Sequence, residues 1–152
     1  QHLLKESIHA DGSRAMSLTS GYVNSHNNPY GHVQPPQNAC LSMVGRDIFD
    51  FATRDVVQSL AALIEGEKEQ IDYFLLHQAN SRILDKIVRK LQIDRSKFLQ
   101  NVEKYGNTSA ATIPILLDEA VVAGTIVLGD NQTVVLSGFG GGLTWASVLL
   151  TL

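Results

Sequence analysis

The sequence predicts an α/β fold in which helices cover a mixed sheet of five strands. Three features of the 152-residue chain support this prediction. A short, almost unbroken apolar run at residues 71–76 is typical of a strand that is buried on both faces. The segments on either side of this run place apolar residues at helical spacing. Near the end of the chain, two strand-like segments flank the glycine-rich residues 138–142, which predicts an antiparallel pair.

The expected strands and helices alternate along the chain. A first strand covers residues 3–9, and a loop rich in Asn, Pro, Gly and His covers residues 21–38. A helix begins at Asp47 and ends at Gly66. The later elements are a strand at 71–76, a helix that follows Asn80 or Ser81, a strand at 98–102, a helix at 109–123, and strands at 133–136 and 143–150. Strands separated by helices predict a largely parallel sheet, and the closing pair predicts one antiparallel edge.

Composition and charge limit the classes of function. The chain is 44% hydrophobic and 18% charged, and it is long enough for one globular domain. Its net charge of −3 provides no general attraction to nucleic acid, and no apolar run approaches the ~20 residues that span a bilayer. The single cysteine, Cys40, excludes an intrachain disulfide and a cysteine-cluster metal site, and it is consistent with a cytoplasmic location. The chain begins at Gln1 without a methionine, so we expect a fragment.

His77 is the first candidate site residue. It lies where the apolar strand at 71–76 ends and the next helix begins, and Gln78 and Asn80 flank it. In open α/β sheets, ligands gather at the carboxyl ends of the strands. His77 either belongs to such a site or only satisfies nearby backbone groups.

Two later turns add polar groups. Asn107 follows Gly106 and serves either as a turn and capping residue or as a carboxamide donor. The glycines at 138–142 either permit a sharp turn or let backbone N–H groups face an anion. They precede a strand rather than open a helix, which argues against a Rossmann phosphate loop. An imidazole, a carboxamide and backbone N–H groups can together stabilise a developing oxyanion, but no nucleophile stands among them.

The helix after Asn80 carries a basic face, and Cys40 lacks an activating environment. Arg82, Lys86 and Arg89 recur at i, i+4 and i+7, opposite the apolar stripe of that helix. This face is either only solvated or binds an acidic partner or phosphate groups. No helix start or nearby base activates Cys40, so we do not expect it to be a nucleophile.

Three motifs, in this order and spacing, resemble the β-ketoacyl-acyl-carrier-protein synthase III family of initiating condensing enzymes. They are His77–Asn80, Tyr105–Ala111 and Gly138–Gly142. The resemblance implies one half of a thiolase-like fold, with residues 1–152 as the C-terminal half-domain. The N-terminal half, which carries the family's catalytic cysteine, is absent from this chain.

The resemblance also implies the roles of individual residues. His77 and Asn107 would be the catalytic partners of the missing cysteine, and the N–H of Gly141 would contribute to an oxyanion hole. Residues on the substrate route would be Gly45, Phe49, Asn80, Arg82 and Phe139. Residues that bind the carrier protein would be Arg82, Lys86 and Arg89.

The implied reaction moves an acyl group from acyl-CoA to the cysteine and then joins it to malonyl carrier protein with loss of CO2. The implied enzyme acts in fatty-acid synthesis as a cytoplasmic homodimer, with acyl-CoA and malonyl acyl carrier protein as its partners. It uses no tightly bound cofactor, no metal and no nucleic acid. Two alternatives remain open: a non-catalytic α/β module, and a CoA-binding or nucleotide-binding module that lacks its own nucleophile.

Overall fold

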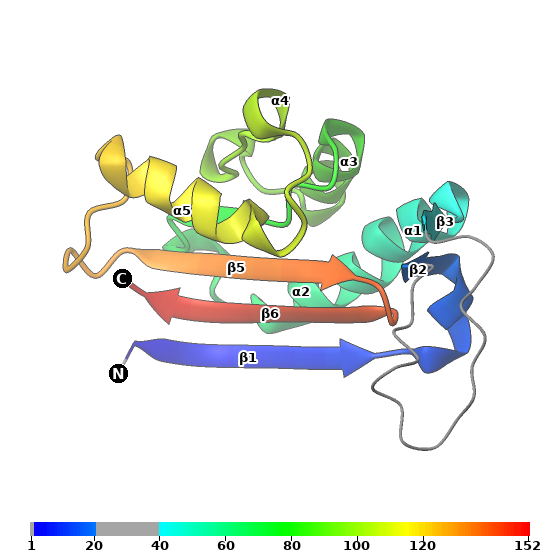
Figure 1. The fold of residues 1–152 in the computed structure, drawn as a ribbon. Coiled ribbons are helices and arrows are strands. Elements are labelled where there is room, and N and C mark those ends of the chain that lie inside the picture. The colour runs from blue at the N-terminus through cyan, green and yellow to red at the C-terminus, as the bar shows by residue number, and fades with distance from the viewer. Residues whose placement is uncertain (1, 21–39) are drawn as a thin grey trace, which may run out of the picture.

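A mixed sheet of four strands forms the centre of the computed structural model, which describes residues 2–20 and 40–152 (Figure 1). The strands are β1 (Leu3–Ala10), β4 (Tyr73–Leu76), β5 (Thr133–Gly140) and β6 (Thr144–Thr151). Their order across the sheet is β1-β6-β5-β4. β4 pairs with β5 in parallel, whereas β6 is antiparallel to both β5 and β1. A separate small sheet pairs β2 (Leu18–Ser20) with β3 (Leu41–Met43).

Two details of the predicted sheet are wrong. The predicted strand at 98–102 is reduced to one isolated bridge between Phe98 and Phe74. Residues Arg95–Lys97 form a 3-10 turn that Asp94 caps, and the chain turns at Val102 into the short helix α4 (Val102–Tyr105). The sheet is also not largely parallel, because β6 lies between β5 and β1 rather than at an edge. The loop predicted at 21–38 lies outside the described residues.

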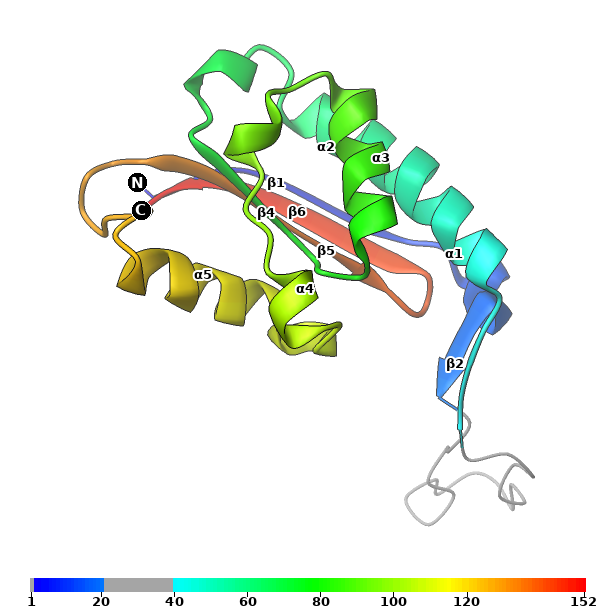
Figure 2. The same ribbon diagram turned by 90° about the horizontal axis from the view of Figure 1, so that it is seen from above.

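Helices cover both faces of the sheet (Figure 2). One face carries a continuous rod, made of α1 (Gly45–Phe51), a π-helical segment (Ala52–Val56) and α2 (Val57–Leu63), together with α3 (Ser81–Leu91). The other face carries α5 (Thr112–Val122), which follows a 3-10 turn at Ser109–Ala111. These helices confirm the predicted helical segments. Gly124 ends the last of them at a φ of +70°, a conformation that glycine adopts without a steric penalty.

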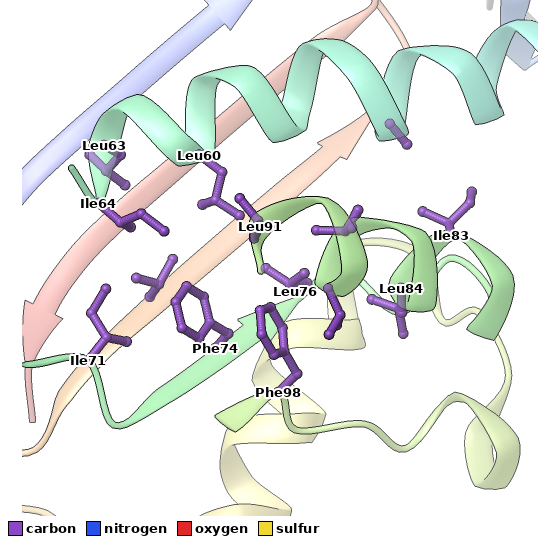
Figure 3. Packing of buried hydrophobic residues seen from close by; sticks show 14 of the residues in the cluster. Leu60, Leu63, Ile64, Ile71, Phe74, Leu76, Ile83, Leu84, Leu91 and Phe98 are labelled. Atoms are coloured by element: carbon purple, nitrogen blue, oxygen red, sulfur yellow. The ribbon is translucent and has the colours of Figure 1, made fainter. Parts of the chain in front are cut away.

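Strand alternation divides the core into two layers. Phe74 and Leu76 pack with the residues of α2 and α3, among them Leu60 and Leu91 (Figure 3). Leu75 faces the other way and packs against α5, as the two-residue period of a strand requires. β4 is therefore held from both sides, which fixes the position of the residue that follows it. Among the described residues, no helix is long and apolar enough to cross a membrane.

Candidate functional site

His77 directly extends β4 and is held from three directions. Its backbone N–H donates to the carbonyl of Ser137 on β5 across 2.8 Å. Its Nδ1 lies 2.7 Å from Oγ1 of Thr112, the first residue of α5. Its ring stands edge-on to Phe139, with 5.1 Å between the ring centroids. Desolvation by burial lowers the pKa of His77 below its ordinary value of 6.5, so the imidazole is neutral at neutral pH.

Asn80 starts the helix that follows His77. Its side-chain Oδ1 accepts a hydrogen bond from the backbone N–H of Ile83 across 2.9 Å, which makes Asn80 the N-cap of α3. Asn80 itself is exposed. Its local role therefore confirms the predicted helix start, and its side chain also borders the cavity described below.

Asn107 presents its carboxamide through the geometry of its turn. Gly106, at a φ of +69°, ends α4 and reverses the chain. Oδ1 of Asn107 accepts the backbone N–H of Ser109 across 2.9 Å. Because this bond occupies the carbonyl side of the carboxamide, its Nδ2 amide group remains as the donor.

A buried hydrogen-bond chain connects the His77 loop to the Asn107 loop. Gln78 is fully buried; its Nε2 donates to the carbonyl of Leu76, and its Oε1 accepts the backbone N–H of Asn101. The Asn101 side chain then donates to Glu119 on α5 across 2.9 Å. Glu119 also accepts from Lys104, which lies on α4. These hydrogen bonds therefore connect the residue before α4 to the buried Gln78 and both ends of α4 to α5, and α4 leads through Gly106 into Asn107.

The glycine hairpin between β5 and β6 is pinned by the residue at its end. Leu143 is fully buried, and it exchanges two backbone hydrogen bonds with Asp11, of 3.0 and 2.8 Å. Oγ1 of Thr144 donates to the carbonyl of Gly141 across 2.8 Å. Gly142 has a φ of +130°. The hairpin is thus a fixed turn rather than a loose loop, and Gly141 lies at its exposed tip.

A cavity of about 1060 Å³ brings these groups together. Five of the predicted site residues line it, namely His77, Asn80, Asn107, Phe139 and Gly141. The remaining lining is mostly apolar and comes chiefly from β1, β3, α5 and the adjoining ends of β5 and β6. An imidazole and a carboxamide on the wall of a largely apolar hollow can stabilise negative charge on an oxygen, because few water dipoles compete there.

Trp145 forms another part of the cavity wall. Its ring stacks on His9 with 5.0 Å between centroids and meets Phe51 edge-on at 5.3 Å. Its Nε1 is buried and has no hydrogen-bond partner among the described residues. The ring of Trp145 therefore contributes an aromatic face to the wall, while its N–H donor is buried.

Other predicted site residues lie outside the cavity lining. Gly45 is exposed at the start of α1, and Phe49 packs against the core layer of α2 and α3. Arg82, Lys86 and Arg89 are exposed on α3. Within the described part of the chain, neither Arg82 nor Lys86 forms an ion pair. The predicted roles of these five residues remain predictions.

Sequence reasoning missed Thr112, which also lines the cavity, and it gave the buried Gln78 no role beyond that of a neighbour of His77. Both are buried polar residues whose partners lie far along the chain. The local signal for Gln78 was only its position directly after His77. Cys40 is exposed and does not line the cavity. Within residues 2–20 and 40–152, no group of His, Cys, Asp and Glu side chains is arranged to hold a metal ion.

Comparison with known proteins gives consistent matches. The family model described as 3-Oxoacyl-[acyl-carrier-protein (ACP)] synthase III C terminal matches residues 63–152. The chain is 59% identical over 152 residues to the β-ketoacyl-[acyl-carrier-protein] synthase III of Enterococcus faecalis, covering 99% of this chain and 46% of that protein. It is 57% identical to the synthase III of Streptococcus mutans, covering 99% and 47%.

A solved structure also matches the chain. The crystal structure of β-ketoacyl-[acyl-carrier-protein] synthase III from Thermus thermophilus has a TM-score of 0.82 and 37% sequence identity, and it covers 97% of this chain and 45% of that chain. The predicted thiolase-like α/β class is confirmed. The chain spans about half the length of the curated relatives that it matches.

Proposed function

We propose a function from one premise: this chain belongs to the 3-oxoacyl-[acyl-carrier-protein] synthase III family and carries its C-terminal part, which confirms the resemblance seen in the sequence. The function is that of the C-terminal half of a condensing acyltransferase. The complete enzyme joins an acyl-CoA primer to malonyl carrier protein, with loss of CO2, and so starts fatty-acid synthesis. The observation that carries this proposal is that His77, Asn107 and Gly141 line one cavity.

The cavity groups suit the decarboxylation step. When the bond between the malonyl methylene carbon and its carboxylate breaks, CO2 leaves and the electron pair moves onto the thioester oxygen. Hydrogen bonds from His77 and from Nδ2 of Asn107 stabilise this enolate. Its carbon then attacks the acyl thioester of the cysteine, the new carbon–carbon bond forms, and the cysteine sulfur leaves. The N–H of Gly141 stabilises the oxyanion of the acyl group during this attack.

In the complete enzyme, an N-terminal half supplies the nucleophilic cysteine, and the residues of this chain follow that half. Relatives about twice as long as this chain support that arrangement. The large apolar side chains exposed in the described part of this chain include those of Ile8, Met16, Leu41 and Met43. Ile8, Leu41 and Met43 also line the cavity, so a covering half would bury apolar surface and close the site in one step.

The remaining partners follow from the same proposal. Acyl-CoA is a substrate rather than a bound cofactor, and no tightly bound cofactor is required. The pantetheine arm passes Gly45, Phe49 and Asn80 and reaches Phe139 at the active centre. The acidic carrier protein binds Arg82, Lys86 and Arg89 on α3. The complete enzyme is a cytoplasmic homodimer.

The decisive experiment separates the two half-reactions in a complete enzyme that contains this chain. We expect His77→Ala and Asn107→Ala each to lower the rate of malonyl decarboxylation by the equivalent of about 2.7–4 kcal/mol, the usual cost of one lost oxyanion donor. We expect both variants to retain more of the acyl transfer from CoA. Equal losses in both half-reactions would assign the two residues to the nucleophile instead.

A second experiment uses the 152-residue chain alone. Incubation with radiolabelled acetyl-CoA should leave no stable thioester on the protein, because the exposed Cys40 lies outside the cavity lining. Label at Cys40 would overturn the assignment of the nucleophile to another half. Tight CoA binding by the chain, together with an inactive complete protein, would favour the alternative of a CoA-binding module.

A further inference from the structure

A short segment, residues 11–18, contacts the glycine hairpin between β5 and β6 at two places. At its start, the backbone of Asp11 exchanges two hydrogen bonds with Leu143. At its end, Leu18 lies against the hairpin tip, because a Cβ atom on Gly141 would be 3.5 Å from the carbonyl oxygen of Leu18. The middle of the segment is a 3-10 helix, Gly12–Ser17. The position of Gly141 therefore depends on how this segment is held.

Arg14 ties the segment to the rest of the fold. Its Nε donates to Oδ2 of Asp11 across 2.7 Å, and its Nη1 donates to Oδ2 of Asp55 across 2.6 Å. Asp55 belongs to the π-helical part of the rod, 41 residues away in the sequence. The guanidinium carbon also lies 5.4 Å from the centroid of the buried Phe51 ring, within the range of a cation–π contact. One guanidinium thus bridges two carboxylates from separate elements.

Both carboxylates are oriented by other bonds. Oδ1 of Asp11 accepts the backbone N–H and the hydroxyl of Ser13, and its other oxygen accepts Arg14. Oδ1 of Asp55 accepts Nε of Arg54 across 3.0 Å, and its other oxygen accepts Arg14. Arginine presents several donors in a rigid planar fork, whereas lysine has one compact ammonium group. A lysine at position 14 would keep the charge but would not hold both carboxylates in this geometry.

We propose that Arg14 is a positioning residue: it clamps Asp11 to the π-helical segment and thereby fixes the hairpin that carries Gly141. Arg14 does not line the cavity of the site. It acts through the backbone pairing of Asp11 with Leu143, the residue at the end of the hairpin.

The consequence for the reaction rests on the proposed function. There the N–H of Gly141 stabilises negative charge on the acyl oxygen, whereas His77 and Asn107 stabilise the enolate. A displaced hairpin should therefore slow acyl transfer to the cysteine and affect malonyl decarboxylation less. A small misplacement of a catalytic group can cost about 100-fold in rate. The expected pattern is the opposite of that for His77→Ala.

The first test follows the backbone amide of Gly141 in the 152-residue chain, by proton–nitrogen NMR of protein labelled with nitrogen-15 glycine. The Gly141 signal is identified by its loss in Gly141→Ala, where a Cβ atom would meet no atom closer than 3.5 Å. We expect Arg14→Gln and Arg14→Lys each to shift this signal. The signal of Gly124, beyond the far end of α5, should stay in place in both variants.

The matched control is Arg54→Gln. Arg54 pairs with the same carboxylate of Asp55, but its side chain is 67% exposed, and in the described structure it does not bond to Asp11. We expect its Gly141 signal to match that of the wild type. In a complete enzyme that contains this chain, Arg14→Gln should lose more of acyl transfer than of decarboxylation, and Arg54→Gln should retain both rates.

Two results would overturn the proposal. The first is an unchanged Gly141 signal in folded Arg14→Gln, and Arg14→Lys decides in the same way if Arg14→Gln does not fold. The second is an equal shift in Arg54→Gln, which would show a general effect of charge rather than of the bridge. A shifted signal with both half-reactions equally affected would support the role of Arg14 and would overturn the proposed role of Gly141. Failure of this proposal is therefore distinguishable from failure of the proposed function.

Discussion

The backbone N–H of Asn101 donates to the side chain of Gln78 across 3.1 Å, although 23 residues separate them in the chain. This bond joins the strand end that carries His77 to the segment that leads into Asn107. Both partners are buried. The relative position of the two proposed donors therefore depends on a residue that does not itself line the cavity.

Removal of the Gln78 carboxamide should loosen this connection. Gln78→Leu fills a similar volume but leaves the buried N–H of Asn101 without its acceptor. We expect the free energy of unfolding to fall by about 1–3 kcal/mol, the usual cost of an unsatisfied buried donor, measured by urea denaturation. Gln58→Leu, at an exposed glutamine on α2, should change the stability little. Equal effects of the two substitutions would show that the connection contributes nothing.

The glycine hairpin should tolerate alanine at one position and reject it at another. A Cβ atom on Gly142 would lie 2.6 Å from Cγ2 of Thr144, and Gly142 has a φ of +130°. We expect Gly142→Ala to destabilise the chain by about 1–3 kcal/mol. Gly140→Ala is the control, because a Cβ there meets no atom within 4 Å. The measurement is the thermal unfolding midpoint of each variant. An equal decrease in both midpoints would contradict this prediction.

Stability should decrease as the pH falls below 6.5, and His77 should be one cause. Burial lowers the pKa of His77 in the folded chain below its ordinary value of 6.5. Between the two values the unfolded chain binds more protons than the folded chain, so acid favours unfolding. The stability that His77 contributes as a neutral buried side chain is fully present above pH 6.5. It is lost as the pH falls from 6.5 through the lower pKa of the folded chain.

A comparison of variants isolates this contribution. His77→Gln cannot titrate, so its stability should depend less on pH in this interval than that of the wild type, as measured by denaturation midpoints. The pH should stay above 4.5, because hydrogen bonds from Lys104 and Asn101 lower the pKa of Glu119 and its own contribution is lost below that value. Parallel pH curves for the two proteins would show that His77 ionises alike in both states.

Charge reversal on α3 should weaken productive encounter with the carrier protein. In the complete enzyme, Arg82→Glu should raise the apparent KM for malonyl carrier protein a few-fold, since an exposed ion pair contributes about 0.2–1 kcal/mol. The maximal rate should barely change. A salt titration tests the cause, because added salt screens such charges beyond ~10 Å at 0.1 M. The same salt dependence in wild type and variant would leave α3 as a solvated face.

Local patterns predicted much of this fold because each element is encoded by its own residues. The apolar run before His77 and the spacing of Ile83, Ile87 and Leu91 identify β4 and α3 without reference to the rest of the chain. The strand order was missed because the placement of β6 between β5 and β1 is a long-range pairing. Phe98 was wrongly assigned to a strand because an apolar aromatic residue is typical of a buried strand. In the structure the Phe98 ring is buried by stacking on Phe74 instead.

The site shows the same division. Turn and strand-end signals identified His77 and Asn107, since each interrupts a local pattern. Thr112 was missed because its partner His77 lies 35 residues away in the sequence. Only the folded chain brings the start of α5 next to Nδ1 of that histidine. The residues that contact the proposed donors are therefore less visible in sequence than the proposed donors themselves.

Trp145 is the only tryptophan of the chain, so all intrinsic tryptophan fluorescence of the chain comes from this one position. Its ring borders the cavity and its indole N–H is buried without a partner. A group that enters the cavity beside this ring changes the polarity around the excited indole. Intrinsic emission from one known position can therefore follow the filling or covering of the cavity in real time, without a label.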